Sequence, residues 1–272
     1  MIPKAYITEW RSHAPWTEDA WVEQDLVISR ALVGIFGAAG VAERLAFRGG
    51  TALYKLYLTP AARYSEDIDL VQTRAEPIGE TLDAVRAALD PWLGTPRRVL
   101  KEGRVNLLYR FDSEDAPPLR LRLKIEINSR EHFSELGLVR VPFRVESRWF
   151  TGEAQVNTFA VDELLATKLR ALYQRKKGRD LFDLWLAIEK GVVDPPTLLA
   201  CFQRYMTEGG HEVSRAQFEQ NLHEKRSAPL FRADLERFLR PGLTWDCDVA
   251  MDVVLERLVA HLPGAASKGK TE

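Results

Sequence analysis

Two stretches of the sequence decide the fold: FRGGTALYKL at residues 47–56 and RYSEDIDL at residues 63–70. In the second stretch, acidic and aliphatic residues alternate, as they do in a strand with one buried face. Side chains alternate between the two faces of a strand, so we expect Asp67 and Asp69 to project together while the aliphatic residues face the core. Two carboxylates held close together are unfavourable unless a cation or a proton relieves them. The pattern therefore predicts a divalent metal site, most simply for Mg²⁺.

The glycine pair of the first stretch separates two short predicted elements. A strand is expected at residues 45–48, and a helix at 52–58 that Thr51 can cap. Backbone N–H groups and the positive end of the dipole at a helix start suit a phosphate, which makes Gly49 and Gly50 candidates for phosphate binding. Taken singly, Gly-Gly is also typical of a simple turn, and Asp-Ile-Asp of a solvated strand edge. Their combination favours a phosphate and metal site.

A third acid lies in a second alternating segment. In LRLRLKIEI, residues 119–127, aliphatic and charged residues alternate without a break, which predicts a half-buried strand. Glu126 then lies on the polar face together with Lys124. If this strand neighbours the Asp67 strand, Glu126 completes a metal cluster and Lys124 neutralises phosphate charge. The alternative is a surface strand with cross-strand salt bridges.

Composition narrows the class of protein. The 272 residues, 46% of them hydrophobic, suffice for one large or two modest domains. With 38 basic and 39 acidic residues, the net charge of -1 creates no global field, so a polyanion has to be bound by a local basic patch. The two cysteines form no disulfide framework, no signal peptide is recognisable, and the longest uncharged apolar run, residues 31–42, is too short to span a bilayer. We therefore expect a cytoplasmic protein without a membrane segment.

The character of the chain changes near its middle. The first half reads as α+β, with helices at 17–39 and 78–89 and strands at 105–111 and 119–128. The second half carries helical spacing throughout, at residues 161–173, 181–188, 195–206, 215–223, 230–239 and 248–261. We expect a first domain at 1–155, a helical domain at 156–262 and a disordered tail at 263–272.

These residues resemble the AbiEii/AbiGii-type toxin nucleotidyltransferases, which include MenT-like proteins and belong to the DNA polymerase β-like superfamily. The matching blocks are GGTAL at 49–53, RYSEDIDL at 63–70, KIEIN at 124–128 and a distal block at 168–184. Many superfamily members have serine directly after the turn glycine. Here Thr51 follows Gly50 and the distance to Asp67 is longer, a departure that suits the toxin branch.

The resemblance implies a polymerase-β-like mixed sheet flanked by helices, followed by a helical C-terminal domain that completes the active-site cleft. The substrate would be a nucleoside triphosphate with Mg²⁺, Mn²⁺ being the alternative ion. Asp67, Asp69 and Glu126 would then be the catalytic, metal-binding acids. The residues carried over to the nucleotide are Gly49, Gly50, Thr51, Ser65, Lys124 and Lys168.

In the distal block, the resemblance implies that Lys168 grips the triphosphate and that Asp183 orients the basic residues or the nucleophile. Asp180 lies near a helix start and can equally cap it. Between them runs a basic loop, which by composition alone is a solvated loop. With the motif in view, its cations are candidates for contacts with the RNA backbone: Arg175, Lys176, Lys177 and Arg179.

Three functions follow from these readings. The leading hypothesis is a toxin that adds a nucleoside monophosphate to the 3′ end of tRNA and so blocks translation. It implies a cognate antitoxin, encoded next to it, and a tRNA acceptor, and we favour a monomer. One alternative is transfer to a protein or to a small molecule such as an aminoglycoside. Another is a catalytically silent module that binds a partner, although no acid of the triad is missing.

Overall fold

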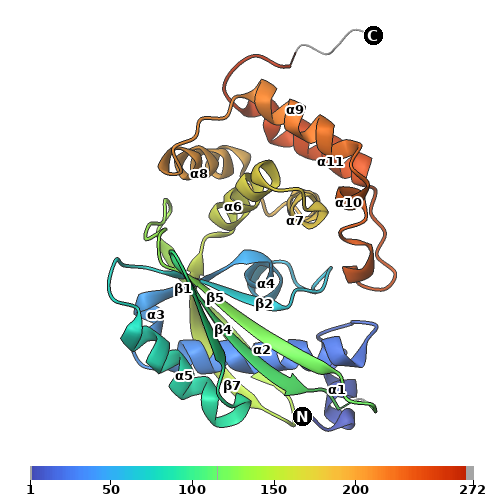
Figure 1. The fold of residues 1–272 in the computed structure, drawn as a ribbon. Coiled ribbons are helices and arrows are strands. Elements are labelled where there is room, and N and C mark those ends of the chain that lie inside the picture. Colours follow the sequence, from blue (N-terminus) through green and yellow to red (C-terminus); the bar gives the residue numbers. More distant parts are fainter. Residues whose placement is uncertain (1, 115, 268–272) are drawn as a thin grey trace. The chain divides into compact units, whose positions relative to one another are not determined.

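The computed structural model describes residues 2–114 and 116–267 (Figure 1). The chain divides into two compact units. The first contains the chain up to Phe159 together with Arg240–Gly242, and the second runs from Ala160 to Leu239 and resumes at Leu243. The domain borders expected from the sequence stay predictions. The last five residues of the expected tail, 268–272, lie outside the described residues.

The first unit is built on one mixed sheet with the strand order β3-β4-β5-β2-β1-β7-β6. The pairs β2–β5 and β1–β7 are parallel, and the remaining neighbours are antiparallel. The expected α+β class with a mixed sheet flanked by helices is therefore confirmed. The strands are β1 (Leu45–Arg48), β2 (Asp67–Gln72), β3 (Arg97–Lys101), β4 (Arg104–Asp112), β5 (Arg120–Asn128), β6 (Leu138–Glu146) and β7 (Thr151–Phe159).

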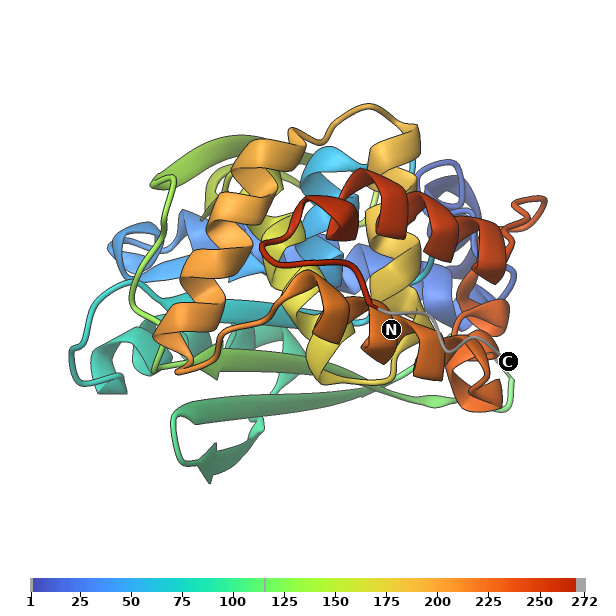
Figure 2. The ribbon, with the colours of Figure 1, turned by 90° about the horizontal axis from the view of Figure 1, so that it is seen from above.

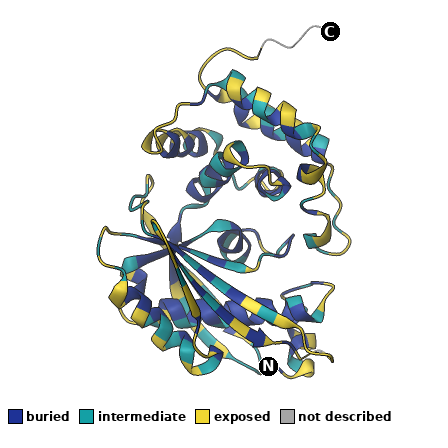
Figure 3. Ribbon diagram, viewed as in Figure 1, coloured by how far each residue is buried: buried dark blue, intermediate teal, exposed yellow. Residues whose placement is uncertain are grey.

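Two long helices cover one face of this sheet. They are α2 (Asp19–Gly37) and α5 (Gly79–Leu93), as the hydrophobic periodicity predicts. The odd-numbered side chains of β4 and β5 are mostly buried beneath them, and the hydroxyl of Tyr109 donates to Asp90 of α5 at 2.7 Å. The even-numbered side chains of both strands are exposed or half-buried over most of their length, and Figure 3 shows this alternation as stripes along β4 and β5. The polar face of β5 is thus open, as its sequence predicts.

Several elements of the first unit were not expected from the sequence. They are α1 (Lys4–Trp10), the short α3 (Val41–Arg44) and the strands β3, β6 and β7. β6 contains Pro142, which usually argues against a strand, but β6 is an edge strand, where a missing N–H is tolerated. In β7 the buried residues are confined to the end of the strand, from Val156 to Phe159, so the alternation is short.

The second unit is helical, as expected. Its main helices are α6 (Val161–Gln174), α7 (Gly178–Glu189), α8 (Pro195–Glu208), α9 (Arg215–Arg226) and α11 (Cys247–Arg257). The helix expected at 230–239 is wrong: the chain forms the short α10 (Pro229–Arg232) and then a 3-10 turn, η2 (Glu236–Phe238). The helix expected at 248–261 begins at Cys247 and gives way to a second 3-10 turn, η3 (Val259–His261). Over the described part of the chain, no helix is both long and apolar enough to cross a membrane.

Candidate active site

The three acids meet on one face of the sheet. In the parallel pair of β2 and β5, Asp67 lies opposite Lys124 and Asp69 lies opposite Glu126. Ile68 is fully buried on the other face, so the strand alternates as its sequence predicts. Side chains opposite each other in neighbouring strands point to the same face. The condition stated for the third acid, that the Glu126 strand neighbours the Asp67 strand, is therefore met.

Basic side chains hold these carboxylates. The Nζ of Lys124 lies 3.0 Å from Oδ2 of Asp67 and 3.4 Å from Oε2 of Glu126. Arg104 approaches Oε1 of Glu126 at 3.5 Å. Arg48, which lies opposite Asp69 in the register of β1 and β2, donates to Glu131 at 2.6 Å. Sequence reasoning missed Arg48, although its place directly before Gly49 was a signal.

The charges of the site shift two pKa values. Burial raises the pKa of Asp69, and the neighbouring charge of Asp67 raises it further. Burial opposes the charged form of Lys124, but its ion pair and hydrogen bond with Asp67 and the charge of Glu126 outweigh this effect, so its pKa is raised. Lys124 is thus firmly cationic, while Asp69 lacks full compensation for its negative charge.

The glycine pair packs directly against this cluster. Gly49 has a φ of +83°, in the left-handed region, and a Cβ at this position would lie 2.3 Å from Oδ2 of Asp69. A Cβ on Gly50 would lie 2.6 Å from the guanidinium of Arg63 and 3.2 Å from Oγ of Ser65. Gly49 therefore needs glycine both for space and for its backbone conformation, whereas a side chain at Gly50 would have to displace the guanidinium of Arg63.

Thr51 does not cap the helix, which corrects the sequence-based assignment. The helix α4 (Gly49–Ala52) begins three residues before the expected start at residue 52, with Arg48 at the N-cap position and no side-chain cap. Instead, the hydroxyl of Thr51 donates to the carbonyl of Asp67 at 2.5 Å, and its oxygen lies 2.9 Å from Oγ of Ser65. Thr51 thereby fixes the start of β2 against the helix. The helix continues as a π-helix, η1 (Leu53–Tyr57), a form that often marks functional sites.

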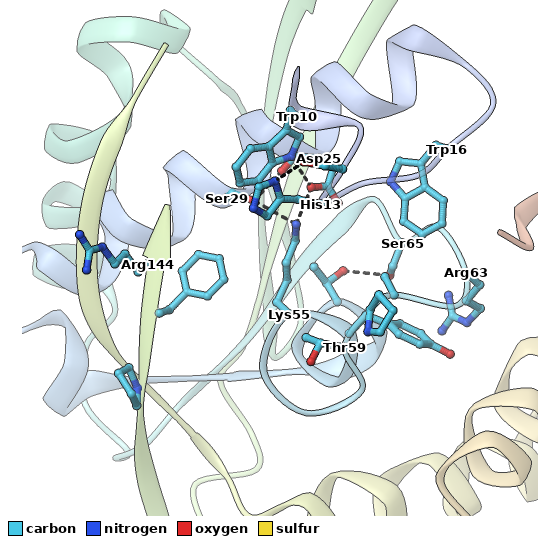
Figure 4. Close-up of a pocket in the computed structure, with 17 residues that line it drawn as sticks. Trp10, His13, Trp16, Asp25, Ser29, Lys55, Thr59, Arg63, Ser65 and Arg144 are labelled. Atoms are coloured by element: carbon cyan, nitrogen blue, oxygen red, sulfur yellow. Dashed lines mark hydrogen bonds and ion pairs between the residues drawn. The ribbon is translucent and has the colours of Figure 1, made fainter. Parts of the chain in front are cut away.

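A cavity of about 370 Å³ lies beside Thr51 and Ser65, which help to line it (Figure 4). Its polar wall is a buried ion pair, in which Nζ of Lys55 on η1 lies 2.6 Å from Asp25 and 2.9 Å from Oγ of Ser29 on α2. The indole of Trp10 donates to the same Asp25 oxygen at 2.9 Å. This network anchors η1 to α2, so it holds the glycine-led helix in place.

The donor set suits a divalent cation. Three carboxylates share one face, and Arg48 and Lys124 compensate the negative charge of Asp69 only in part. Next to Glu126 in the register of β4 and β5, the buried Oδ1 of Asn106 has no hydrogen-bond partner among the described residues. The described side chains do not already form a ready-made metal site with three acidic, histidine or cysteine ligands. In this arrangement the amine of Lys124 lies between Asp67 and Glu126, so the metal-binding roles stay predictions.

In the second unit, Lys168 lies within a buried ion network. Its Nζ is 3.2 Å from Asp180 and 3.0 Å from Asp183, and both acids are fully buried. Burial opposes the ionised form of Asp180, but Lys168 and Arg175 outweigh it and lower its pKa. Asp180 lies within the first turn of α7, whose N-cap is Lys177, so it is an ion-pair partner rather than a cap. Asp183 holds the Lys168 ammonium, while the predicted triphosphate contact of Lys168 remains to be tested.

The basic loop is largely engaged in ion pairs of its own unit. Arg175 donates to Asp180 at 2.7 Å, and Lys177 and Arg179 approach Asp234 at 3.2 and 3.6 Å. Lys176 is exposed. The expected RNA-binding role of this loop therefore stays a prediction, and Asp234 is a partner that sequence spacing gave no means to find.

Solved structures show the same fold. MenT4, the nucleotidyltransferase toxin Rv2826c from Mycobacterium tuberculosis H37Rv, matches with a TM-score of 0.67 at 18% identity, over 97% of this chain and 91% of that chain. A putative nucleotidyltransferase from H. pylori matches with a TM-score of 0.53 at 17% identity, over 89% of this chain and 97% of that chain. JHP933 from Helicobacter pylori matches with a TM-score of 0.51 at 17% identity, over 89% of this chain and 94% of that chain. At these identities the likeness concerns the fold alone.

Family membership comes from the sequence itself. A comparison with curated proteins finds no match. The family model described as nucleotidyl transferase AbiEii toxin, type IV toxin–antitoxin system, matches residues 30–253, which include the three acids, the glycine pair and the buried network of α6 and α7. The chain therefore belongs to the AbiEii family of toxin nucleotidyltransferases.

Proposed function

We propose that this enzyme transfers a nucleoside monophosphate from a triphosphate to the 3′ end of tRNA in a Mg²⁺-dependent reaction, and so blocks translation. Its family makes it a toxin nucleotidyltransferase, a class that uses a nucleoside triphosphate and a divalent metal, and implies an antitoxin partner. The observation that carries the proposal is the placement of Asp67, Asp69 and Glu126 on one sheet face, directly against the start of the helix led by Gly49.

The chain supplies its own phosphate-binding groups beside these acids. The first N–H groups of α4 and the hydroxyl of Ser65 are donors that suit the triphosphate. In the reaction, the acceptor oxygen forms a bond to the α-phosphorus, the bond from the α-phosphorus to pyrophosphate breaks, and the hydroxyl proton passes to water. Lys124 is positioned to exchange partners, from Asp67 and Glu126 to the phosphates, which frees both carboxylates. In its present position the ion pairs with Asp67 and Glu126 raise the pKa of Lys124, so the amine is charged before the exchange.

Asp67, Asp69 and Glu126 are the residues that would hold Mg²⁺, which when bound activates the attacking hydroxyl and stabilises the departing pyrophosphate. Asp69 favours this ion because desolvation and the neighbouring charge of Asp67 disfavour its ionised form and raise its pKa. From the second unit, we assign the triphosphate contact to Lys168, and to Asp183 the task of orienting it. The contact of 3.0 Å between these two side chains supports that assignment.

The enzyme class of this proposal rests on the site, whereas the tRNA acceptor is inferred from the family resemblance. Transfer to a protein or to a small molecule is the competing enzyme hypothesis. A silent binding module is disfavoured because all three acids are present and adjacent. We also propose that the toxin acts in the cytoplasm, as a monomer when it is not bound by its antitoxin.

The decisive experiment incubates the purified protein with Mg²⁺, each of the four α-labelled nucleoside triphosphates and total tRNA. We expect label at the tRNA 3′ end, and its loss in Asp67→Asn. The matched control is Asp83→Asn, an exposed acid on α5, the helix that covers the other face of the sheet. Label on added protein or aminoglycoside instead of tRNA would support the alternative. No label in any acceptor would remove the activity claim.

A further inference from the structure

The open face of β3, β4 and β5 carries a concentration of positive charge. In the antiparallel registers, Arg97 lies opposite Leu108, Lys101 opposite Arg104, and Arg110 opposite Arg122. Opposite residues share a face, so Arg97 and Lys101 of β3 point the same way as the even-numbered residues of β4 and β5. These even-numbered residues face away from α2 and α5. We call this set the basic face: Arg97, Lys101, Arg104, Arg110 and Arg122.

Most of this charge is uncompensated. All five side chains of the basic face are exposed. The acids on the same face are already paired, Asp112 with Arg120 at 2.9 Å and Glu126 with Lys124 and Arg104. Within residues 2–114 and 116–267, four of the five cations, all but Arg104, show no ion pair. Because the whole chain has a net charge of -1, this excess is a local feature.

The basic face is continuous with the three acids. Asp67, Lys124, Leu108 and Arg97 form one row across β2, β5, β4 and β3. Neighbouring strands are about 4.8 Å apart, so the row extends roughly 14 Å from the carboxylates to the sheet edge. In Figure 2 the green β3–β4 hairpin lies at that edge. A chain of phosphates that crosses this face would therefore end at the acids.

The chemistry of the face selects the phosphate backbone of a nucleic acid. Its remaining members, such as Val99, Asn106 and Leu108, include no aromatic ring on which a base could stack. Exposed arginines and a lysine bind phosphates through charge and hydrogen bonds without reading sequence. The basic loop of the second unit is a weaker candidate, because Arg175, Lys177 and Arg179 already pair with acids there.

We propose that the basic face binds the phosphate backbone of the acceptor RNA and directs its 3′ end to Asp67, Asp69 and Glu126. This inference rests on the proposed function, since it assumes an RNA acceptor. Binding through this face depends on salt and not on the sequence of the stem. The specificity of the enzyme then comes from the shape of the RNA and from its free 3′ end.

The test measures the affinity of a fluorescent RNA hairpin with a single-stranded 3′ end, without any nucleoside triphosphate, between about 50 and 200 mM salt. The variant is Arg97→Glu with Arg110→Glu. Arg98→Glu is the matched control, because Arg98 is an exposed residue of the same strand that lies opposite the buried Leu107 and so points to the other face. A third arm, Lys176→Glu with Lys177→Glu, tests the basic loop.

We expect the double variant to bind at least about tenfold more weakly and to lower the slope of log affinity against log salt by about two, one for each lost phosphate contact. Arg98→Glu should bind as the wild type does. Equal affinities of the double variant and Arg98→Glu, loss of binding in the loop arm alone, or no hairpin binding by the wild type would each overturn the inference.

Label transfer is assayed separately. Binding through the basic face without transfer refutes only the proposed function, whereas transfer that is unaffected by the double variant refutes only the inference.

Discussion

Replacing Gly49 with alanine tests how tightly the glycine-led helix is joined to the acids. The new Cβ would lie 2.3 Å from Oδ2 and 3.1 Å from Cβ of Asp69, and the φ of +83° is unfavourable for alanine. Gly40→Ala is the matched control in the same unit, because Gly40 has a φ of +75° and no atom within 4 Å of the added Cβ. The backbone contribution should be about 1–2 kcal/mol in both variants. Only Gly49→Ala also has to displace Asp69.

The displacement should make the two variants clearly different. An overpacked contact of this kind typically costs about 1–3 kcal/mol, so Gly49→Ala should lose that much more free energy of unfolding than Gly40→Ala in urea titrations followed by tryptophan fluorescence. A shift of a reacting group by about 1 Å can lower a rate by about a hundredfold, so nucleotide transfer should fall steeply in Gly49→Ala and stay normal in Gly40→Ala.

A double-mutant cycle isolates the contact itself. Asp69→Ala removes the carboxylate that the new methyl group meets, so most of the extra destabilisation should disappear in the Gly49→Ala, Asp69→Ala double variant. The reasoning is refuted if Gly49→Ala is as stable and as active as Gly40→Ala, or if the two effects simply add.

Three further predictions concern charge. Lys168→Met leaves the buried Asp180 and Asp183 without their shared cation, so it should lower the free energy of unfolding by about 3–5 kcal/mol. The exposed Lys177→Met is the control and should lower it by about 1 kcal/mol or less. Equal losses in urea titrations of the two variants would contradict the buried network. Loss of activity in Lys168 variants is therefore informative only beside a stability measurement. Asp69→Asn should raise the melting temperature at neutral pH, because the raised pKa of Asp69 means that the folded state disfavours its ionised form. The same variant should abolish nucleotide transfer. A lower melting temperature would refute this prediction. Burial lowers the pKa of Lys225 to about 8, so the folded state binds fewer protons than the unfolded state above that pH. The stability of the wild type relative to Lys225→Met should thus rise between pH 8 and the ordinary pKa of 10.5, by roughly 1 kcal/mol per pH unit at most, and fall as the pH returns through 8; a flat difference would contradict the buried charge.

The sequence predicted the parts of the site that local periodicity encodes. A period of two places Asp67 and Asp69 on one face, and the same period places Glu126 and Lys124 on the open face of their strand. The sequence could state only as a condition that the strand of Asp67 and the strand of Glu126 are neighbours, because strand pairing is a long-range property that residue spacing does not reveal. The structure supplies it through the parallel register of β2 and β5.

Other features lay beyond local reasoning for physical reasons. The start of α4 at Gly49 depends on a positive φ and on the space beside Asp69, which local sequence does not reveal. The sequence therefore predicted Thr51 as the helix cap, whereas its hydroxyl bonds to the carbonyl of Asp67. β7 has few alternating apolar residues because only its end is buried. The pairing of Lys168 with Asp180 and Asp183 depends on how α6 and α7 pack, which helical periodicity alone does not specify.

The most direct test of the central claim is Mn²⁺ binding, followed by electron paramagnetic resonance, with a non-hydrolysable nucleoside triphosphate present. The account predicts that the wild type and Asp83→Asn bind the ion and the nucleotide together, and that Asp67→Asn and Asp69→Asn lose the bound-ion signal. Undiminished Mn²⁺ binding in Asp67→Asn and Asp69→Asn would show that the acids beside the glycine-led helix do not hold the metal.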